Sequence, residues 1–173
     1  MPAEKISIDK AKKNKLFYFV ANAVVYRESD GRCLILKRGD HEIAHSGRYG
    51  VVGGKLEWED LPLDGYDNMN GDVLDYHSAL EKLLIREAFE EAGIEIYSDL
   101  RYVGSKAFIR PDEVPSVLLQ VTARYKTGDV VLEENAFSDY AWVTPEEARN
   151  YPCIDGIPEE LEIAVRLWQE KPL

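Results

Sequence analysis

The stretch REAFEEAGI, residues 86–94, closes a predicted helix that begins near Ser78. Ser78 is a candidate N-cap with Glu81 at the capping-box position, and Gly93 is a candidate C-terminal stop. A helix that is apolar on two sides is expected to pack between other elements of the fold. Two apolar stripes run along this one: Leu80, Leu83 and Leu84, and then Ile85, Phe89 and Ala92.

Three carboxylates, those of Glu87, Glu90 and Glu91, continue one side of the same helix. At about 100° per residue they fall within an arc of about 100°, so they repel one another. Solvent would relieve this repulsion, and so would a hard cation, for which carboxylate oxygens are natural ligands. The spacing alone favours a solvated face, because glutamate-rich helix ends are common and Arg86 can pair with Glu90.

The sequence upstream changes this interpretation. GGKLE at residues 53–57, followed by residues 86–94, resembles the Nudix box: Gly, five residues, Glu, seven residues, then a motif of the form RE-apolar-x-EE-x-G-apolar. The helical half matches at every specified position, and the resemblance extends over roughly residues 16–170. It implies the α/β (α+β) class, as a Nudix-type α/β/α sandwich with a mixed β-sheet.

The loop half of the box departs from the family pattern. Six positions after Gly54 the chain has Asp60 rather than glutamate, and the helical half is displaced along the chain. We therefore expect an insertion at about residues 60–77, dense in Asp, Asn, Gly and Pro, that forms a surface loop or a lid. The candidates for the displaced loop glutamate are Glu57, Glu59 and Asp60.

The resemblance implies hydrolysis of a pyrophosphate bond in a nucleoside diphosphate linked to another moiety: a nucleoside triphosphate, ADP-ribose or a nucleotide sugar. It implies Mg²⁺ as the cofactor, with Mn²⁺ as a substitute, because these ions prefer oxygen ligands. The implied metal site has Glu90 and Glu91 as its principal ligands. Glu87 is a third ligand or the residue that orients the water, and the backbone at Gly54 completes the site, because a glycine permits close approach.

The same resemblance assigns catalytic roles. Glu87 and Glu90 are catalytic candidates, and Arg86 is expected to orient a carboxylate by a charge-assisted hydrogen bond. The general base is left open between a helical glutamate and an acid on a later loop, either Glu133 or Glu134.

Substrate recognition is less strongly marked. Pro111 lies 17 residues beyond Ile94, near the position of a proline in ADP-ribose-cleaving relatives. Phe17 and Tyr18 either stack on a base or pack within the core or a dimer. The predicted substrate-binding residues, each of which also has a simpler explanation as a surface or packing residue, are Arg38, Arg48, Tyr49 and Arg110.

The rest of the chain predicts a mixed α/β domain, with residues 1–15 as an N-terminal arm and residues 16–173 as a single Nudix domain. Helices are expected to start at Thr144-Pro145, with Glu147 closing a capping box, and near Pro158. The expected strands are Leu16–Tyr26, Cys33–Lys37, Tyr49–Val52, Tyr102–Ile109, Val117–Tyr125 and Tyr140–Val143.

Composition limits the partners. The net charge of −11 argues against a nucleic-acid backbone or an anionic membrane. A small-molecule nucleotide is the expected partner, and a homodimer is common among relatives. Cys33 and Cys153 lack a CxxC spacing, which favours ordinary thiols in a cytoplasmic protein. The charged N-terminus has no apolar core typical of a secretory signal.

Two other functional classes share this fold. A non-catalytic nucleotide-sensing module would bind tightly without turnover, and the intact helical motif argues against it. An isomerase would need a catalytic cysteine, and neither Cys33 nor Cys153 has a recognisable context for that role.

Overall fold

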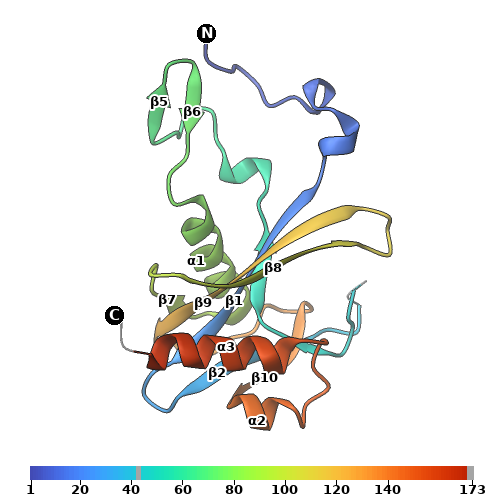
Figure 1. The fold of residues 1–173 in the computed structure, drawn as a ribbon, viewed down its shortest axis with the longest axis vertical. Coiled ribbons are helices and arrows are strands. Elements are labelled where there is room, and N and C mark those ends of the chain that lie inside the picture. Colours follow the sequence, from blue (N-terminus) through green and yellow to red (C-terminus); the bar gives the residue numbers. More distant parts are fainter. Residues whose placement is uncertain (42–43, 171–173) are drawn as a thin grey trace.

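The computed structural model describes residues 1–41 and 44–170. Its centre is a mixed sheet in which the path β10-β2-β1-β9-β7 is joined by β3 on β2, β4 on β1 and β8 on β9 (Figure 1). β1 and β9 are parallel, whereas β1 is antiparallel to β2 and β4. The strands of this sheet are β1 (Tyr18–Arg27), β2 (Arg32–Arg38), β3 (Tyr49–Gly50), β4 (Val52–Lys55), β7 (Glu95–Ile96), β8 (Arg101–Ile109), β9 (Pro115–Thr127) and β10 (Phe137–Val143).

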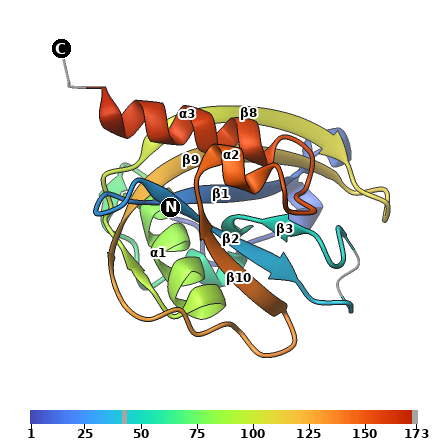
Figure 2. The same ribbon diagram turned by 90° about the horizontal axis from the view of Figure 1, so that it is seen from below.

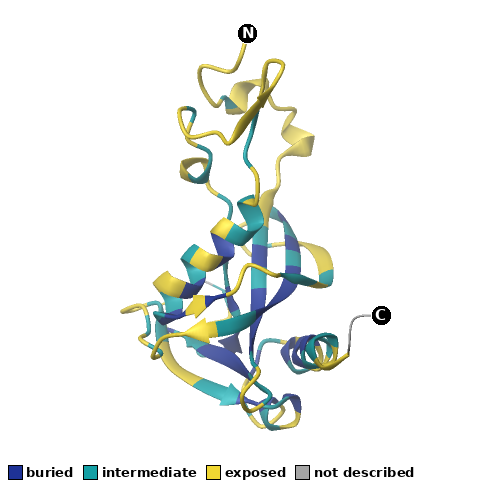
Figure 3. Cartoon of the chain, turned by 90° about the vertical axis from the view of Figure 1, so that its left-hand side faces the viewer, coloured by how far each residue is buried: buried dark blue, intermediate teal, exposed yellow. Residues whose placement is uncertain are grey.

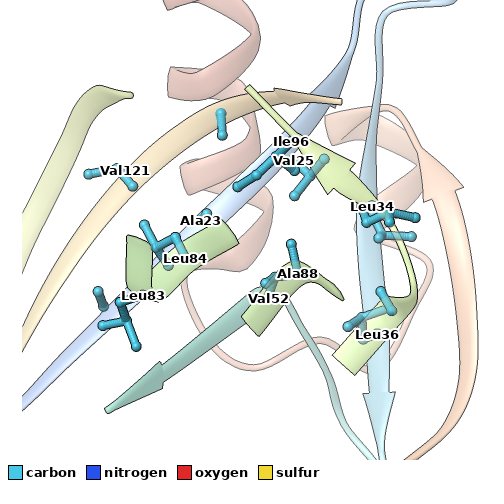
Figure 4. Packing of buried hydrophobic residues seen from close by; sticks show 14 residues of the cluster. Ala23, Val25, Leu34, Leu36, Val52, Leu83, Leu84, Ala88, Ile96 and Val121 are labelled. Carbon is cyan, nitrogen blue, oxygen red and sulfur yellow. The ribbon is translucent and has the colours of Figure 1, made fainter. Parts of the chain in front are cut away.

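Helices cover both faces of the sheet. α1 (Ala79–Ala92) lies on one face, and α2 (Pro145–Ala148) and α3 (Ile157–Gln169) lie on the other (Figure 2). The alternation of β1 produces the two cores: Ala23 and Val25 pack with α1, whereas Val24 packs with α3. Figure 4 shows the first core, with side chains from α1, β1, β2 and β4 in contact. The predicted α/β/α sandwich is confirmed.

α1 buries one side, not two. Leu83 and Leu84 are buried as expected, but Ile85 is 39% and Phe89 65% exposed. The expectation that both apolar stripes pack is therefore wrong for Ile85 and Phe89, whereas Ala92 of the second stripe is buried in the core. Ser78 occupies the N-cap position in a left-handed conformation without a side-chain cap, so the predicted capping box is absent. Gly93 ends the helix in the left-handed conformation, as predicted.

Other local predictions hold. Thr144 caps α2 in a reciprocal box with Glu147. Cys33 and Cys153 are buried free thiols. α1 and α3, the long helices of the described chain, fall short of the length and hydrophobicity that crossing a bilayer requires.

The expected insertion contains structure of its own. Residues 68–75 form a small hairpin of β5 (Asn68–Asn70) and β6 (Val73–Asp75). Residues 1–15 contain two 3-10 turns, Ile8–Lys10 and Lys13–Lys15, and no buried residue. Both segments project from the same end of the molecule and are mostly exposed (Figure 3). Residues 171–173 of the predicted domain lie outside the described residues.

Candidate active site

Two consecutive glycines bring β4 against the acidic end of α1. A Cβ atom added at Gly54 would lie 2.2 Å from the carboxyl carbon of Glu87, far inside contact distance. The Gly53 N–H donates a 2.9 Å hydrogen bond to Oε2 of Glu91. Gly54 therefore lets the β4 backbone approach Glu87, whereas a side chain at Gly53 would collide with Ala21 and Asn22 of β1.

Glu87 and Glu91 lie in surroundings that disfavour their charge. The Glu87 side chain is only 12% exposed, and Glu91 is partly buried. Burial raises the pKa of Glu87, against the opposing effect of the Arg86 guanidinium. Burial also raises the pKa of Glu91 to about 8; the Gly53 N–H opposes this shift, and the negative charge of Glu87 adds to it. Two such carboxyls side by side would be stabilised by a cation.

Arg86 holds the acids of the site together. Its guanidinium lies 3.0 Å from Oε1 of Glu87, 3.0 Å from Oε2 of Glu90 and 3.3 Å from Oδ1 of Asp60. These contacts support a role for Arg86 in orienting carboxylates. Asp60, which stands at the position of the box where a glutamate is expected, is the loop acid that reaches the helix. Glu57 and Glu59 are both exposed, and of the two only Glu57 is among the residues that line the neighbouring cleft.

The donor set fits a hard divalent cation, because carboxylate oxygens adjoin a glycine backbone. The ligands are not fully gathered. Within residues 1–41 and 44–170, no three His, Cys, Asp or Glu side chains form a ready-made metal-binding group. Glu90 is half exposed and turned toward Arg86. Glu87 and Glu91 thus lie beside the glycine backbone of β4, whereas Glu90 is paired with Arg86.

A cleft of about 1030 Å³ opens beside these carboxylates and reaches α3 on the far side of the sheet. Glu87, Glu90 and Glu91 line one end. Its volume suits a nucleotide-sized ligand. The basic residues that line it are Arg38, Arg48, Lys55, Arg86, Lys106 and Arg110.

Three of the four predicted substrate-binding residues line this cleft. Arg38 donates from Nε to the Ala44 carbonyl at 2.9 Å, and Arg48 donates to the Cys153 carbonyl at 3.1 Å. Arg110 lies 5.6 Å from the centre of the Tyr18 ring. Pro111 lines the cleft as well.

Tyr49 is the exception. Its side chain is 5% exposed, packs edge-on against Tyr151 at 5.0 Å and donates a hydrogen bond to Asp139. It belongs to the core between the sheet and α3. The assignment of Tyr49 to the substrate site is therefore corrected: alternation along β3 and β4 directs this ring into the core.

Replacing Tyr49 by phenylalanine tests this correction. We expect the free energy of unfolding to fall by about 1 kcal/mol, because one partly buried hydrogen bond is lost. kcat/KM should stay within twofold of wild type. Chemical denaturation and steady-state kinetics measure both, with the exposed Tyr140→Phe as the control. A tenfold rise in KM for Tyr49→Phe would return Tyr49 to the substrate site.

Glu133 and Glu134, the two loop candidates for the general base, differ in their position relative to the cleft. Glu133 lines the cleft, and its backbone N–H donates to the Glu91 carbonyl at 3.0 Å. Its charge also contributes to the raised pKa of Glu87. Glu134 is exposed and is not among the residues that line the cleft. Position therefore favours Glu133 over Glu134 as the loop candidate for the general base.

Sequence reasoning missed the cleft residues Lys55, Lys106 and Glu160. Lys55 directly follows Gly54 in the GGKLE motif, and that proximity is the sequence signal that could have identified it as a cleft residue. Lys106 and Glu160 carry no local signal, because a strand and a helix distant in sequence bring them together.

Comparison with known proteins agrees with this geometry. The NUDIX domain family matches residues 18–162, so the chain belongs to this family and is a Nudix-type pyrophosphohydrolase. No curated protein matches the chain significantly.

Solved structures show the same fold at low identity. A MutT protein from Methanosarcina mazei Go1 is 20% identical with a TM-score of 0.62, over 92% of this chain and 100% of that one. The NUDIX domain of Shewanella oneidensis NrtR, complexed with ADP ribose, is 15% identical with a TM-score of 0.65, over 94% and 96%. A MutT NUDIX hydrolase from Burkholderia pseudomallei is 20% identical with a TM-score of 0.60, over 86% and 98%.

Proposed function

We propose that this protein uses Mg²⁺ to hydrolyse the pyrophosphate bond of a nucleoside diphosphate linked to another moiety. The observation that carries the proposal is that the α1 carboxylates and a basic lining share one cleft. Guanidinium and ammonium groups attract phosphate oxygens, and carboxylates hold the divalent cation that a phosphate substrate also binds.

Glu87 and Glu91 would hold the Mg²⁺ beside the Gly54 backbone, and Glu90 would complete the carboxylate set. When bound, the ion would neutralise phosphate charge and lower the pKa of the attacking water. Arg86 keeps Glu87 oriented through its 3.0 Å ion pair. Glu87 or Glu133 would accept the proton of the water.

Arg38 and Arg110 would bind the phosphates, with the bond to be cleaved next to the carboxylates. Arg48, which contacts the Cys153 carbonyl and Asp155, would contact the phosphate or the base. ADP-ribose is one candidate substrate, since a NUDIX domain of the same fold was solved with it and Pro111 lines this cleft. Nucleoside triphosphates and nucleotide sugars are the others. Two buried free thiols favour the reducing cytoplasm as the site of action.

A substrate panel tests the proposal. Canonical and oxidised nucleoside triphosphates, ADP-ribose and nucleotide sugars are incubated with the protein, and products are separated by anion-exchange chromatography. We expect Mg²⁺-dependent release of a nucleotide from at least one substrate, loss of turnover with a chelator, and partial recovery with Mn²⁺. Tight binding of a nucleotide without turnover of any substrate would identify a nucleotide-sensing module instead.

A further inference from the structure

The α3 end of the cleft contains a carboxylate that hydrolysis does not use. Glu160 is 9% exposed and is the one charged side chain among the buried residues of the described chain. It nevertheless lines the cleft, at the end away from the α1 glutamates. The other acid at this end, Asp155, is exposed, so Glu160 needs its own explanation.

Two neighbours hold Glu160 in place. The Nζ of Lys106 on β8 lies 3.6 Å from its Oε1, and the Gln120 side chain on β9 is a neighbour that lowers its pKa. Burial raises the pKa of Glu160, and Lys106 opposes that rise. Strand pairing fixes this arrangement, because Gly104 and Lys106 pair with Gln120 and Leu118.

The pair has hydrogen-bonding capacity left for a ligand. A carboxylate can accept about four hydrogen bonds, and its two neighbours supply about two of them. Lys106 has three N–H donors, and its side chain is 47% exposed. Acceptors and donors therefore lie side by side at a cleft wall whose neighbouring apolar residues include Phe108, Leu118 and Ile157.

This chemistry selects one kind of group. A phosphate placed here would be repelled by the Glu160 carboxylate, so this end does not suit the anionic part of a substrate. An aliphatic group would leave buried polar atoms without partners, which is costly. A flat ring with N–H donors beside an acceptor fits both the polar pair and the apolar walls, and nucleobases have this form.

We propose that Glu160, together with Lys106, determines base specificity by binding the hydrogen-bonding edge of the substrate's nucleobase. The carboxylate accepts from base N–H groups, and the ammonium donates to an adjacent base acceptor. The base then lies at the α3 end and the phosphates at the α1 end. This inference rests on the proposed function for its substrate class.

The test measures binding separately from turnover. The four nucleoside 5′-monophosphates of adenine, guanine, cytosine and uracil are titrated into metal-free protein by calorimetry. We expect wild type to bind them with at least a tenfold spread in Kd, and Glu160→Gln to reduce that spread to about threefold. With the substrate found by the panel, Glu160→Gln should raise KM at least tenfold and leave kcat within threefold.

Glu159→Gln is the matched control, since it makes the same charge change on α3 at an exposed residue paired with Arg149. It should leave the spread and KM unchanged. Lys106→Met keeps the carboxylate but removes its donor, so it should alter the order of the four affinities even if Glu160→Gln folds poorly. Thermal unfolding confirms that each variant is folded.

Two results would overturn the inference: a wild type without base preference, or variants at positions 160 and 106 that keep the wild-type order of affinities. Turnover without base preference would refute the inference and leave the proposed function intact. Base-selective binding that depends on Glu160, without turnover of any substrate, would support the inference and refute the proposed function.

Discussion

Glu91→Gln should lower kcat/KM by about a thousandfold and, at pH 8, raise the melting temperature of the metal-free protein by about 5 °C. The activity falls because the variant loses a carboxylate of the proposed cation site beside Gly53. The stability rises because glutamine still accepts the Gly53 hydrogen bond without bringing a charge into a buried position. Steady-state kinetics and calorimetric unfolding measure the two effects.

The stability effect depends on pH. The pKa of Glu91 is about 8 in the folded protein against an ordinary value of 4.5, so the folded state retains a proton that the unfolded chain releases. Its contribution to stability is full below about pH 4.5 and is lost as the pH rises through about 8. The stability advantage of Glu91→Gln over wild type should therefore grow between pH 5 and pH 8.

Glu95→Gln is the control, because Glu95 is exposed and pairs with Lys126 on the surface. Compared with Glu91→Gln, it should have little effect on kcat/KM or on the pH dependence of the melting temperature. Adding Mg²⁺ should raise the melting temperature of wild type and not that of Glu91→Gln. Equal activity of Glu91→Gln and wild type would remove Glu91 from the metal site.

Gly54→Ala should lower kcat/KM by at least a hundredfold while the protein stays folded. The new methyl group would need the space of the Glu87 carboxyl carbon, 2.2 Å away. That carboxyl group is the end of a flexible side chain, so it moves aside and the fold tolerates the change. Displacing a reacting group by about an ångström is sufficient for a loss of this size. Kinetics and circular dichroism measure activity and folding.

A second substitution separates displacement of Glu87 from other damage. In the double variant Gly54→Ala with Glu87→Asp, the shorter side chain leaves room for the methyl group. We expect the double variant to be no less active than Glu87→Asp alone, because the two sites are coupled. If the fold losses in activity of Gly54→Ala and Glu87→Asp instead multiply in the double variant, Gly54 acts through something other than Glu87.

The sequence predicted the parts of this protein that depend on local pattern. The carboxylate helix, its Gly93 end, the strands β1 and β2 and the Thr144 cap follow from periodicity and capping chemistry within short windows. The Nudix resemblance then supplied the sandwich, which no short window contains. Asp60 is one of three sequence candidates for the loop glutamate, and the structure adds the contact with Arg86 that favours it.

The predictions that failed depend on contacts between distant segments. Phe89 is apolar at helical spacing, yet 65% of it is exposed among the residues that the structure describes. The sequence neighbours of Tyr49, Arg48 and Gly50, line the cleft, but the Tyr49 ring packs against Tyr151 in the core between the sheet and α3. Glu160 and Lys106 meet because α3 crosses the sheet above β8, and no pattern within either element reveals that crossing.

The parallel pairing of β1 with β9 also determines when the catalytic cleft can form during folding. Val24 pairs with Thr122, 98 positions later, so the central strands join only after most of the chain has been synthesised. Closing so long a loop costs entropy before its contacts are made, which slows folding. Until then β1 has an unpaired edge, and the glutamates of α1 lack the far wall of their cleft. Recovery of activity on refolding therefore reports completion of the whole sheet rather than formation of the helix.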